Sequence, residues 1–192
     1  YANQKNITWF ASCWDESSVD FMEELDIPCY KIASASVTNL DLLKKISKTK
    51  RPVMMSTGMS TMKEIQTAVD ILDCDNFLIA HSTSSYPASY NELNLRMINT
   101  LDSTYDCPIG YSGHEIGLST TVSTIPLGVS FIERHITLNR AMWGTDQSAS
   151  IEPQGMVRLA RDIRIVESAL GDGVKKVYDS EKPIIAKLRG NS

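Results

Sequence analysis

The chain alternates between short apolar runs and longer segments in which apolar residues recur at helical spacing. The runs show little internal alternation, as expected of strands that are buried on both faces. They occupy residues 6–12, 29–34, 52–58, 76–82, 107–113 and 128–136. The amphipathic segments that follow them occupy residues 16–25, 39–48, 61–72, 91–103, 116–126 and 153–170. The pattern therefore predicts six strand–helix units.

This order predicts a parallel sheet covered by helices. Asn39 or Asp41, Ser60 or Thr61, and Pro153 are the expected helix-start residues. No GxGxxG or GxxxxGK[ST] loop follows the first predicted strand, which disfavours a dinucleotide-binding fold. Six similar units fit most of an eight-stranded barrel, so we expect an α/β fold that is an incomplete TIM (β/α)8-type barrel.

Composition indicates an ordinary globular chain. Its 192 residues are 42% hydrophobic, enough for one sizeable core. A net charge of −4 with interspersed signs argues against nucleic acid or an anionic membrane as partner, and no apolar run approaches the roughly 20 residues of a membrane span. The four cysteines form no CxxC pair and are expected to be free thiols in a reducing cytoplasm; they are Cys13, Cys29, Cys74 and Cys107.

Reactive polar side chains stand at or near the ends of the predicted strands. They belong to Ser12, Lys31, Ser34, Ser56, His81, Ser112, His114, Glu133 and His135. In a βα barrel the carboxyl ends of all strands meet at one face, where the active site lies. We therefore expect these side chains, although distant in sequence, to converge.

His114 and His135 end consecutive predicted strands. Neutral imidazoles from neighbouring strand ends can share one divalent ion and leave positions open for water and substrate. The small number of soft ligands favours Mn²⁺ or Mg²⁺ over structural zinc. From the residues alone, two hydrogen-bonded core histidines are an equally good interpretation.

Glu133 and His135 are two residues apart, so on a strand they face one side while Arg134 faces the other. Glu133 could hold the histidine ring, bind a substrate hydroxyl or move a proton. It could instead belong to a buried ion pair. Arg134 is expected to point to the helix layer and to pair with an acid there.

Lys31 lies at the centre of a predicted strand, and Ser34, Ser56 and Ser112 are expected at the same face. One lysine with several hydroxyls favours binding of a phosphate group. A Schiff base between Lys31 and a carbonyl compound is the chemical alternative. The second alternative is a structural lysine whose ammonium group reaches solvent.

Two polar loops complete the candidate site. Residues 83–95 contain Tyr86, and residues 143–150 contain Asp146. Both loops are suited to a hydroxylated ligand, although each alone is also typical of a plain surface loop.

Six motifs occur in one order: KIAS, STGM, STSSYP followed by NLR, GYSGHE, IERHITL and GTDQSASIEP. In this order they resemble the sialic acid synthase family, and the resemblance continues through ALGDG (169–173) and KLR (187–189). It implies a TIM barrel that condenses phosphoenolpyruvate with an N-acyl amino sugar such as N-acetylmannosamine. The product would be a nonulosonic acid, and the expected assembly is a homodimer.

The resemblance also implies a role for each candidate residue. The divalent metal, Mn²⁺ or Mg²⁺, would be held by His114 and His135. Phosphoenolpyruvate would be bound by Lys31, Ser34, Ser56, Ser112 and Ser12. The sugar would be faced by the catalytic set Glu133, Tyr86 and Asp146. The metal would polarise the aldehyde oxygen while C3 of phosphoenolpyruvate attacks, and phosphate would leave by C–O cleavage after water adds at C2.

Three positions depart from the family pattern. An acid is replaced by Ser36, an asparagine by Ser84 and a histidine by Gln147. These differences raise the alternative of another nonulosonic acid as product, such as one of the legionaminic type.

Residues 1–192 are expected to be a partial TIM-barrel catalytic domain. The chain begins at what resembles the third barrel strand, and the family's small C-terminal antifreeze-like domain would lie beyond residue 192. We therefore expect low or no synthase activity from this segment alone. The alternatives are a non-catalytic barrel that binds sugar or phosphate or serves in assembly, and a Schiff-base aldolase that uses Lys31.

Overall fold

A five-stranded parallel sheet forms the centre of the protein. The computed structural model describes residues 1–73 and 76–190. Its strands are β1 (Tyr30–Ile32), β2 (Val53–Ser56), β3 (Phe77–Ser82), β4 (Ile109–Gly113) and β5 (Phe131–Arg134). They lie side by side in sequence order, and each pairs in parallel with the next. The sheet is thus a parallel α/β half-barrel, an arc of the predicted TIM-type fold.

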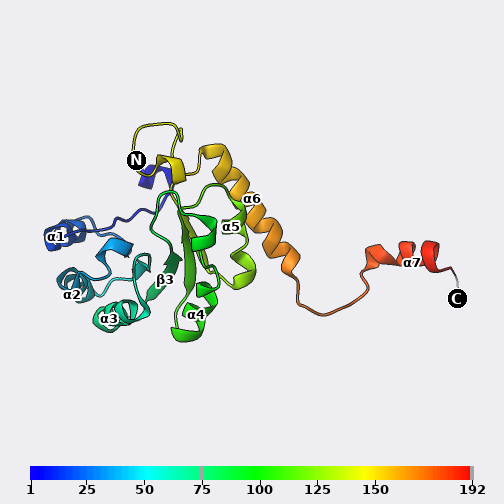
Figure 1. Ribbon diagram of the computed structural model, residues 1–192, viewed down its shortest axis with the longest axis horizontal. Helices are drawn as coiled ribbons and strands as arrows, with labels where there is room; N and C mark the ends of the chain where they lie inside the picture. Colours follow the sequence, from blue (N-terminus) through cyan, green and yellow to red (C-terminus); the bar gives the residue numbers. More distant parts are fainter. Residues whose placement is uncertain (74–75, 191–192) are drawn as a thin grey trace.

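Helices lie around the outer side of this arc (Figure 1). The α-helices are α1 (Glu16–Glu24), α2 (Leu40–Thr49), α3 (Met62–Leu72), α4 (Met97–Thr104), α5 (Ser119–Val122), α6 (Pro153–Leu170) and α7 (Lys182–Arg189). The 3-10 helices are η1 (Asn3–Lys5), η2 (Ser34–Ser36), η3 (Tyr90–Glu92), η4 (Ile125–Leu127), η5 (Gln147–Ala149) and η6 (Asp179–Glu181). No α-helix in the described part of the chain is long and apolar enough to cross a membrane.

The helix starts follow from local capping. The side chains of Asn39 and Thr61 accept hydrogen bonds from the backbone N–H groups of Leu42 and Glu64, which would otherwise have no partner at the helix end. Pro153 is the first residue of α6, where its missing N–H costs nothing. These three predicted starts are confirmed.

Two predicted helices are shorter in the structure. The segment predicted from residue 91 begins as an α-helix only at Met97, because η3 and the positive φ of Asn94 interrupt it. The segment 116–126 forms α5 over Ser119–Val122 and then the 3-10 helix η4, whose second residue, Pro126, cannot donate a helical hydrogen bond.

The first predicted strand, residues 6–12, is wrong as a strand of the sheet. Only Ser12 pairs, through an isolated parallel bridge to Lys31. Its apolar residues remain largely outside the core: Ile7 is 58% exposed and Trp9 39% exposed. Apolar content alone therefore predicted a strand that does not form. Among the described residues, β1 is the edge strand at this side of the sheet. The described residues form five sheet strands where six were predicted.

The core lies between the outer face of the sheet and the helices. Its fully buried side chains include Tyr30, Ile32, Leu42, Leu43, Ile46, Met55, Ile79, Ile98 and Leu101. They come from alternate strand positions and from the inner faces of the helices, as the two periodicities predict. The segment with α7 extends away from this body in Figure 1, and no described residue of α7 is buried.

The described cysteines form no disulfide bond. They are Cys13, Cys29 and Cys107, and Cys74 lies outside the described residues. Burial raises the pKa of the Cys13 and Cys29 thiols, which keeps both in the less reactive protonated form.

A buried ion pair connects the ends of β4 and β5 to the helix layer. Nη1 of Arg134 lies 3.2 Å from Oε1 of Glu115, and the two side chains are 1% and 0% exposed. Thr121 donates a hydrogen bond to the same carboxylate, and Arg134 also donates to the Gly117 carbonyl. Burial acts to raise the pKa of Glu115, but the hydrogen bond from Thr121 and the charge of Arg134 outweigh it and leave this pKa below its ordinary value. The predicted outward pairing of Arg134 with an acid is confirmed.

We predict that Arg134→Met destabilises the fold by about 3–5 kcal/mol, because it leaves the Glu115 carboxylate buried without its cation. The measurement is urea-induced unfolding followed by circular dichroism. Arg164→Met is the matched control, since Arg164 pairs with Glu167 at the surface with 79% of its side chain exposed. It should cost less than about 1 kcal/mol.

The double variant Glu115→Leu/Arg134→Met should cost less than the sum of its two single variants, because it leaves no unpaired charge. Equal losses in Arg134→Met and Arg164→Met would contradict a structural role for the buried pair.

Candidate active site

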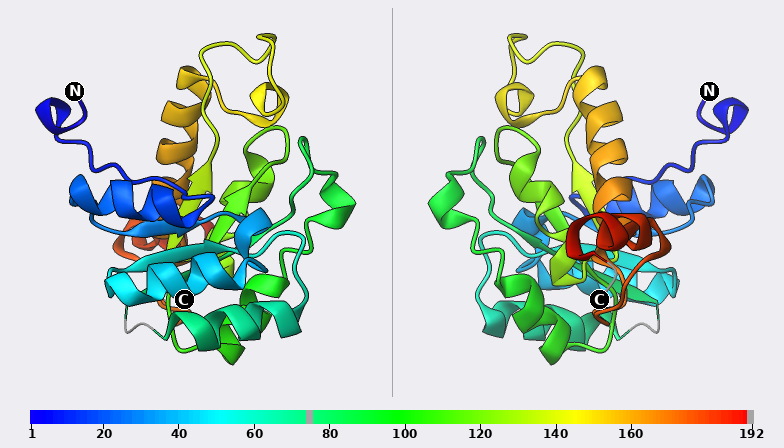
Figure 2. Two further views of the ribbon diagram at one scale, coloured as in Figure 1. Left: turned by 90° about the vertical axis from the view of Figure 1, so that its left-hand side faces the viewer. Right: turned by 90° about the vertical axis from the view of Figure 1, so that its right-hand side faces the viewer.

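One cavity at the carboxyl ends of the strands gathers the candidate residues. It has a volume of about 340 Å³. All ten side chains assigned to the site from the sequence line it: Ser12, Lys31, Ser34, Ser56, Tyr86, Ser112, His114, Glu133, His135 and Asp146. The loop after β5, which carries Asp146, stands above this edge of the sheet (Figure 2). The predicted convergence is thus observed, while the roles of the residues remain predictions.

An ion pair connects the first and last strands of the sheet across the cavity. Nζ of Lys31 on β1 donates to both carboxylate oxygens of Glu133 on β5, at 2.7 and 2.6 Å. Ser112 on β4 donates to the same carboxylate at 2.8 Å. Inward-facing residues of the first and last strands therefore meet, because the sheet curves.

Glu133 is an ionised acid in this arrangement. Burial acts to raise the pKa of Glu133, but the charge of Lys31 and the hydrogen bonds from Lys31 and Ser112 together hold this pKa below its ordinary value. Glu133 does form an ion pair, but the pair lines the cavity and 29% of the Glu133 side chain is exposed, so it differs from the buried pair given as the alternative. Such a carboxylate can accept hydrogen bonds from a ligand.

The two histidines face each other beside this pair. The ring centres of His114 and His135 are 5.1 Å apart, with the planes nearly perpendicular, and Tyr86 packs on His114 at 4.2 Å between ring centres. Burial lowers the pKa of His114, so its ring is neutral at pH 7, the form that binds metals.

Nδ1 of each histidine faces an oxygen atom. The Nδ1 atom of His114 lies 2.7 Å from the Thr83 carbonyl and therefore carries the proton that it donates. Asp146 Oδ2 lies 3.4 Å from Nδ1 of His135. His114 therefore has Nε2 available as an acceptor or metal ligand.

The donor set fits a weakly held divalent ion. The described residues contain no cluster of three or more His, Cys, Asp or Glu side chains that could enclose a metal. Two imidazoles whose ring centres are 5.1 Å apart can both reach one ion, since metal–nitrogen bonds are about 2.0–2.2 Å long. The remaining positions would be open to a ligand.

Hydroxyl groups line the side of the cavity near Lys31. The buried Oγ of Ser56 has no hydrogen-bond partner. Ser34 accepts from the N–H of Gly58 at 3.0 Å, which leaves its own proton to donate. A cation with adjacent hydroxyl donors is the usual setting for a phosphate or carboxylate group.

His81 does not join this cavity, contrary to expectation. The register pairs Ser56 with Ala80, so the next residue, His81, points to the helix side of the sheet. There its Nε2 lies 2.7 Å from the carbonyl of Leu93.

Other parts of the site were missed from the sequence. Phe10, Trp14 and Ala33 also line the cavity. Trp14, two residues after the candidate Ser12, could have been noted, because aromatic rings near polar side chains are common in ligand sites. The Thr83 carbonyl could not be found, since a main-chain contact has no residue signature.

Three known proteins resemble this chain over nearly all of its length. It is 37% identical to the N,N'-diacetyllegionaminic acid synthase of Campylobacter jejuni and 38% identical to the N-acetylneuraminate-9-phosphate synthase of Homo sapiens, in each case over 98% of the chain. The crystal structure of the N-acetylneuraminic acid synthetase of Leptospira borgpetersenii, in complex with citrate, matches 99% of the chain with a TM-score of 0.86 and 32% identity.

The chain covers only part of these relatives. It spans 58% and 56% of the two curated synthases and 68% of the crystallised chain. Residues 1–175 match the NeuB family. The resemblance noted from the motifs is thereby confirmed: the chain belongs to the NeuB family.

Proposed function

We propose that this chain is the barrel portion of an enzyme that condenses phosphoenolpyruvate with an N-acyl amino sugar. The products are a nonulosonic acid and inorganic phosphate. One observation carries the proposal: a lysine, several serine hydroxyls and two imidazoles line a single cavity in a NeuB-family chain. The relatives' names, which include legionaminic and N-acetylneuraminate-9-phosphate synthases, support the product class.

Phosphoenolpyruvate is bound near Lys31 in this proposal. The ammonium group of Lys31 attracts the negatively charged substrate, and the hydroxyls of Ser34 and Ser56 donate to its oxygens. Ser112, which donates to Glu133 in this structure, would exchange that bond for one to the substrate. Ser12 lies at the same edge through its bridge to Lys31. The partnerless hydroxyl of Ser56 supports this assignment, because a ligand oxygen would satisfy it.

The amino sugar is bound across the cavity. Tyr86 packs on His114, and Asp146 lies beside His135, so both face the space next to the imidazoles. Glu133 is central to the cavity and is ionised, and it would accept a hydrogen bond from a sugar hydroxyl. These contacts orient the aldehyde carbon toward C3 of phosphoenolpyruvate.

His114 and His135 would hold Mn²⁺ or Mg²⁺ through Nε2. Such an ion, when bound, supplies Lewis-acid polarisation of the aldehyde oxygen. The residues of the chain fix the two rings, exclude part of the solvent and keep the anion next to the sugar. A homodimer and a cytoplasmic location remain predictions.

The geometry gives less support to a Schiff-base aldolase. An amine that forms an imine must first lose its proton. Lys31 is instead bound as an ammonium ion by both oxygens of Glu133.

We predict that His114→Ala and His135→Ala each weaken Mn²⁺ binding by about 100-fold or more, because each removes one of two protein ligands. The measurement is the loss of the free Mn²⁺ signal in electron paramagnetic resonance. His81→Gln is the matched control: His81 lies outside the cavity, and glutamine can still donate to Leu93. It should keep the wild-type affinity. Equal affinity in all four proteins would remove the metal from the proposal.

The synthase activity is tested in the protein that contains these residues. Incubation with phosphoenolpyruvate, Mn²⁺ and a panel of mono- and di-N-acetylated amino sugars should give a nonulosonic acid, detected by mass spectrometry. With ¹⁸O in the bridging C–O–P position, the label should appear in the released phosphate. Lys31→Met should lower kcat/KM by about 100-fold or more, whereas the exposed Lys48→Met should not.

Absence of a nonulosonic acid with every sugar of the panel would reject the proposal. If Mn²⁺ and phosphoenolpyruvate still bound in that case, the non-catalytic binding module would be the supported alternative.

A further inference from the structure

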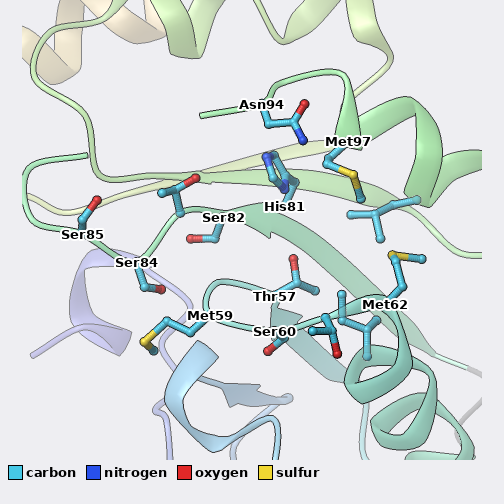
Figure 3. Close-up of a pocket in the computed structure, with 14 residues that line it drawn as sticks. Thr57, Met59, Ser60, Met62, His81, Ser82, Ser84, Ser85, Asn94 and Met97 are labelled. Atoms are coloured by element: carbon cyan, nitrogen blue, oxygen red, sulfur yellow. The ribbon is translucent and has the colours of Figure 1, made fainter. Parts of the chain in front are cut away.

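A second and larger cavity lies outside the candidate active site. Its volume is about 630 Å³, and it is formed at the ends of β2 and β3 with α3 and α4 (Figure 3). It is lined by Thr57, Met59, Ser60, Thr61, Met62, Ile65, His81, Ser82, Thr83, Ser84, Ser85, Asn94, Met97 and Leu101. It shares none of its lining residues with the first cavity.

No charged side chain lines this space. Among the fourteen described lining residues there is no Asp, Glu, Lys or Arg. His81 is neutral as well: burial lowers its pKa, and only the hydrogen bond to Leu93 acts in the opposite direction. A charged ligand would lose its hydration without gaining an ionic partner. The second cavity therefore differs in chemistry from the first.

Three serines and two methionines lie at opposite ends of the second cavity. Figure 3 shows Ser82, Ser84 and Ser85 at one end, with Met59 near Ser84, and Met62 and Met97 at the other. The hydroxyl oxygens of Ser82 and Ser85 are buried and have no hydrogen-bond partner, and Ser82 is only 6% exposed. Buried hydroxyls in this state are costly unless a ligand or water satisfies them.

The apolar side suits a short hydrocarbon chain. Ile65 and Leu101, which are 3% and 0% exposed, also line the cavity. Thioether side chains adapt to different apolar shapes because they are unbranched and polarisable. A ligand with one polar and one apolar end matches both sides at once.

The two cavities share a wall. The N–H of Gly58 donates to Ser34 in the first cavity, and a Cβ at Gly58 would clash with the hydroxyl of Ser84 in the second. On the same loop, the carbonyl of Thr83 holds His114. An occupant of the second cavity would therefore contact the loop that orients the candidate metal ligand.

We propose that the second cavity binds an uncharged amphipathic small molecule. Its amide or hydroxyl group would bond to Ser82 and Ser85, and its short acyl or alkyl chain would lie between Met62 and Met97. This site is separate from the one used in the proposed synthase reaction, and its existence does not depend on that reaction.

The test compares hexanamide with hexanoate, which share a chain but differ in charge. The chain is labelled with ¹³C at the methionine methyl groups and titrated with each compound by NMR. Hexanamide should shift the signals of Met59, Met62 and Met97 in a saturable way, and hexanoate should bind at least about tenfold more weakly. The signal of Met22, a buried residue of α1, should stay unchanged.

Met62→Asp should abolish these shifts at Met59 and Met97. Met62 is 36% exposed and is the first residue of α3, where an acid is favourable, so the variant should fold while placing a carboxylate at the apolar end. Lys63→Asp is the matched control, because Lys63 is exposed and does not line the cavity; it should bind like the wild type. Absent saturable shifts, equal binding of both compounds, or retained binding in Met62→Asp would each overturn the proposal.

Discussion

Parallel hydrogen bonding between the strands decides where the functional side chains lie. Because neighbouring strands run in one direction, all five carboxyl ends lie at one edge of the sheet. Register then sets the neighbours, with Ser82 beside Ser112 and Ser112 beside Glu133. Curvature completes the cavity, since Lys31 on β1 reaches Glu133 on β5 although three strands lie between them. The site is therefore a product of the whole arc and of no single motif.

Much of the fold could be predicted because its signals are local. Periodicity located the five sheet strands and the six helices that cover them, and capping chemistry located the starts at Asn39, Thr61 and Pro153. The errors arose where the structure of a segment depends on residues that are distant in the sequence. Residues 6–12 are apolar enough for a strand, but strand formation also needs a partner on the sheet, and only Ser12 finds one.

The candidate site was predictable to the extent that strand ends converge. Period-two alternation gave the opposite directions of Glu133 and Arg134, and both occur as expected. The pairing of Lys31 with Glu133 could not be predicted, because it depends on how far the sheet curves. The second cavity was also invisible in the sequence, since its serines and methionines look like ordinary loop and helix residues until α3 and α4 are placed side by side.

The two ion pairs of β5 fix which face of the sheet its side chains occupy. Glu133 bonds to Lys31 on the cavity side, and Arg134 bonds to Glu115 on the helix side. Insertion or deletion of one residue within β5, ahead of Glu133, would exchange the two faces and direct a guanidinium into the cavity and a carboxylate into the helix layer. Insertion of two residues would restore the directions while shifting both pairs along the strand. Insertions and deletions in the segment between α5 and β5 should thus be tolerated during evolution, whereas those of a single residue within β5 should not.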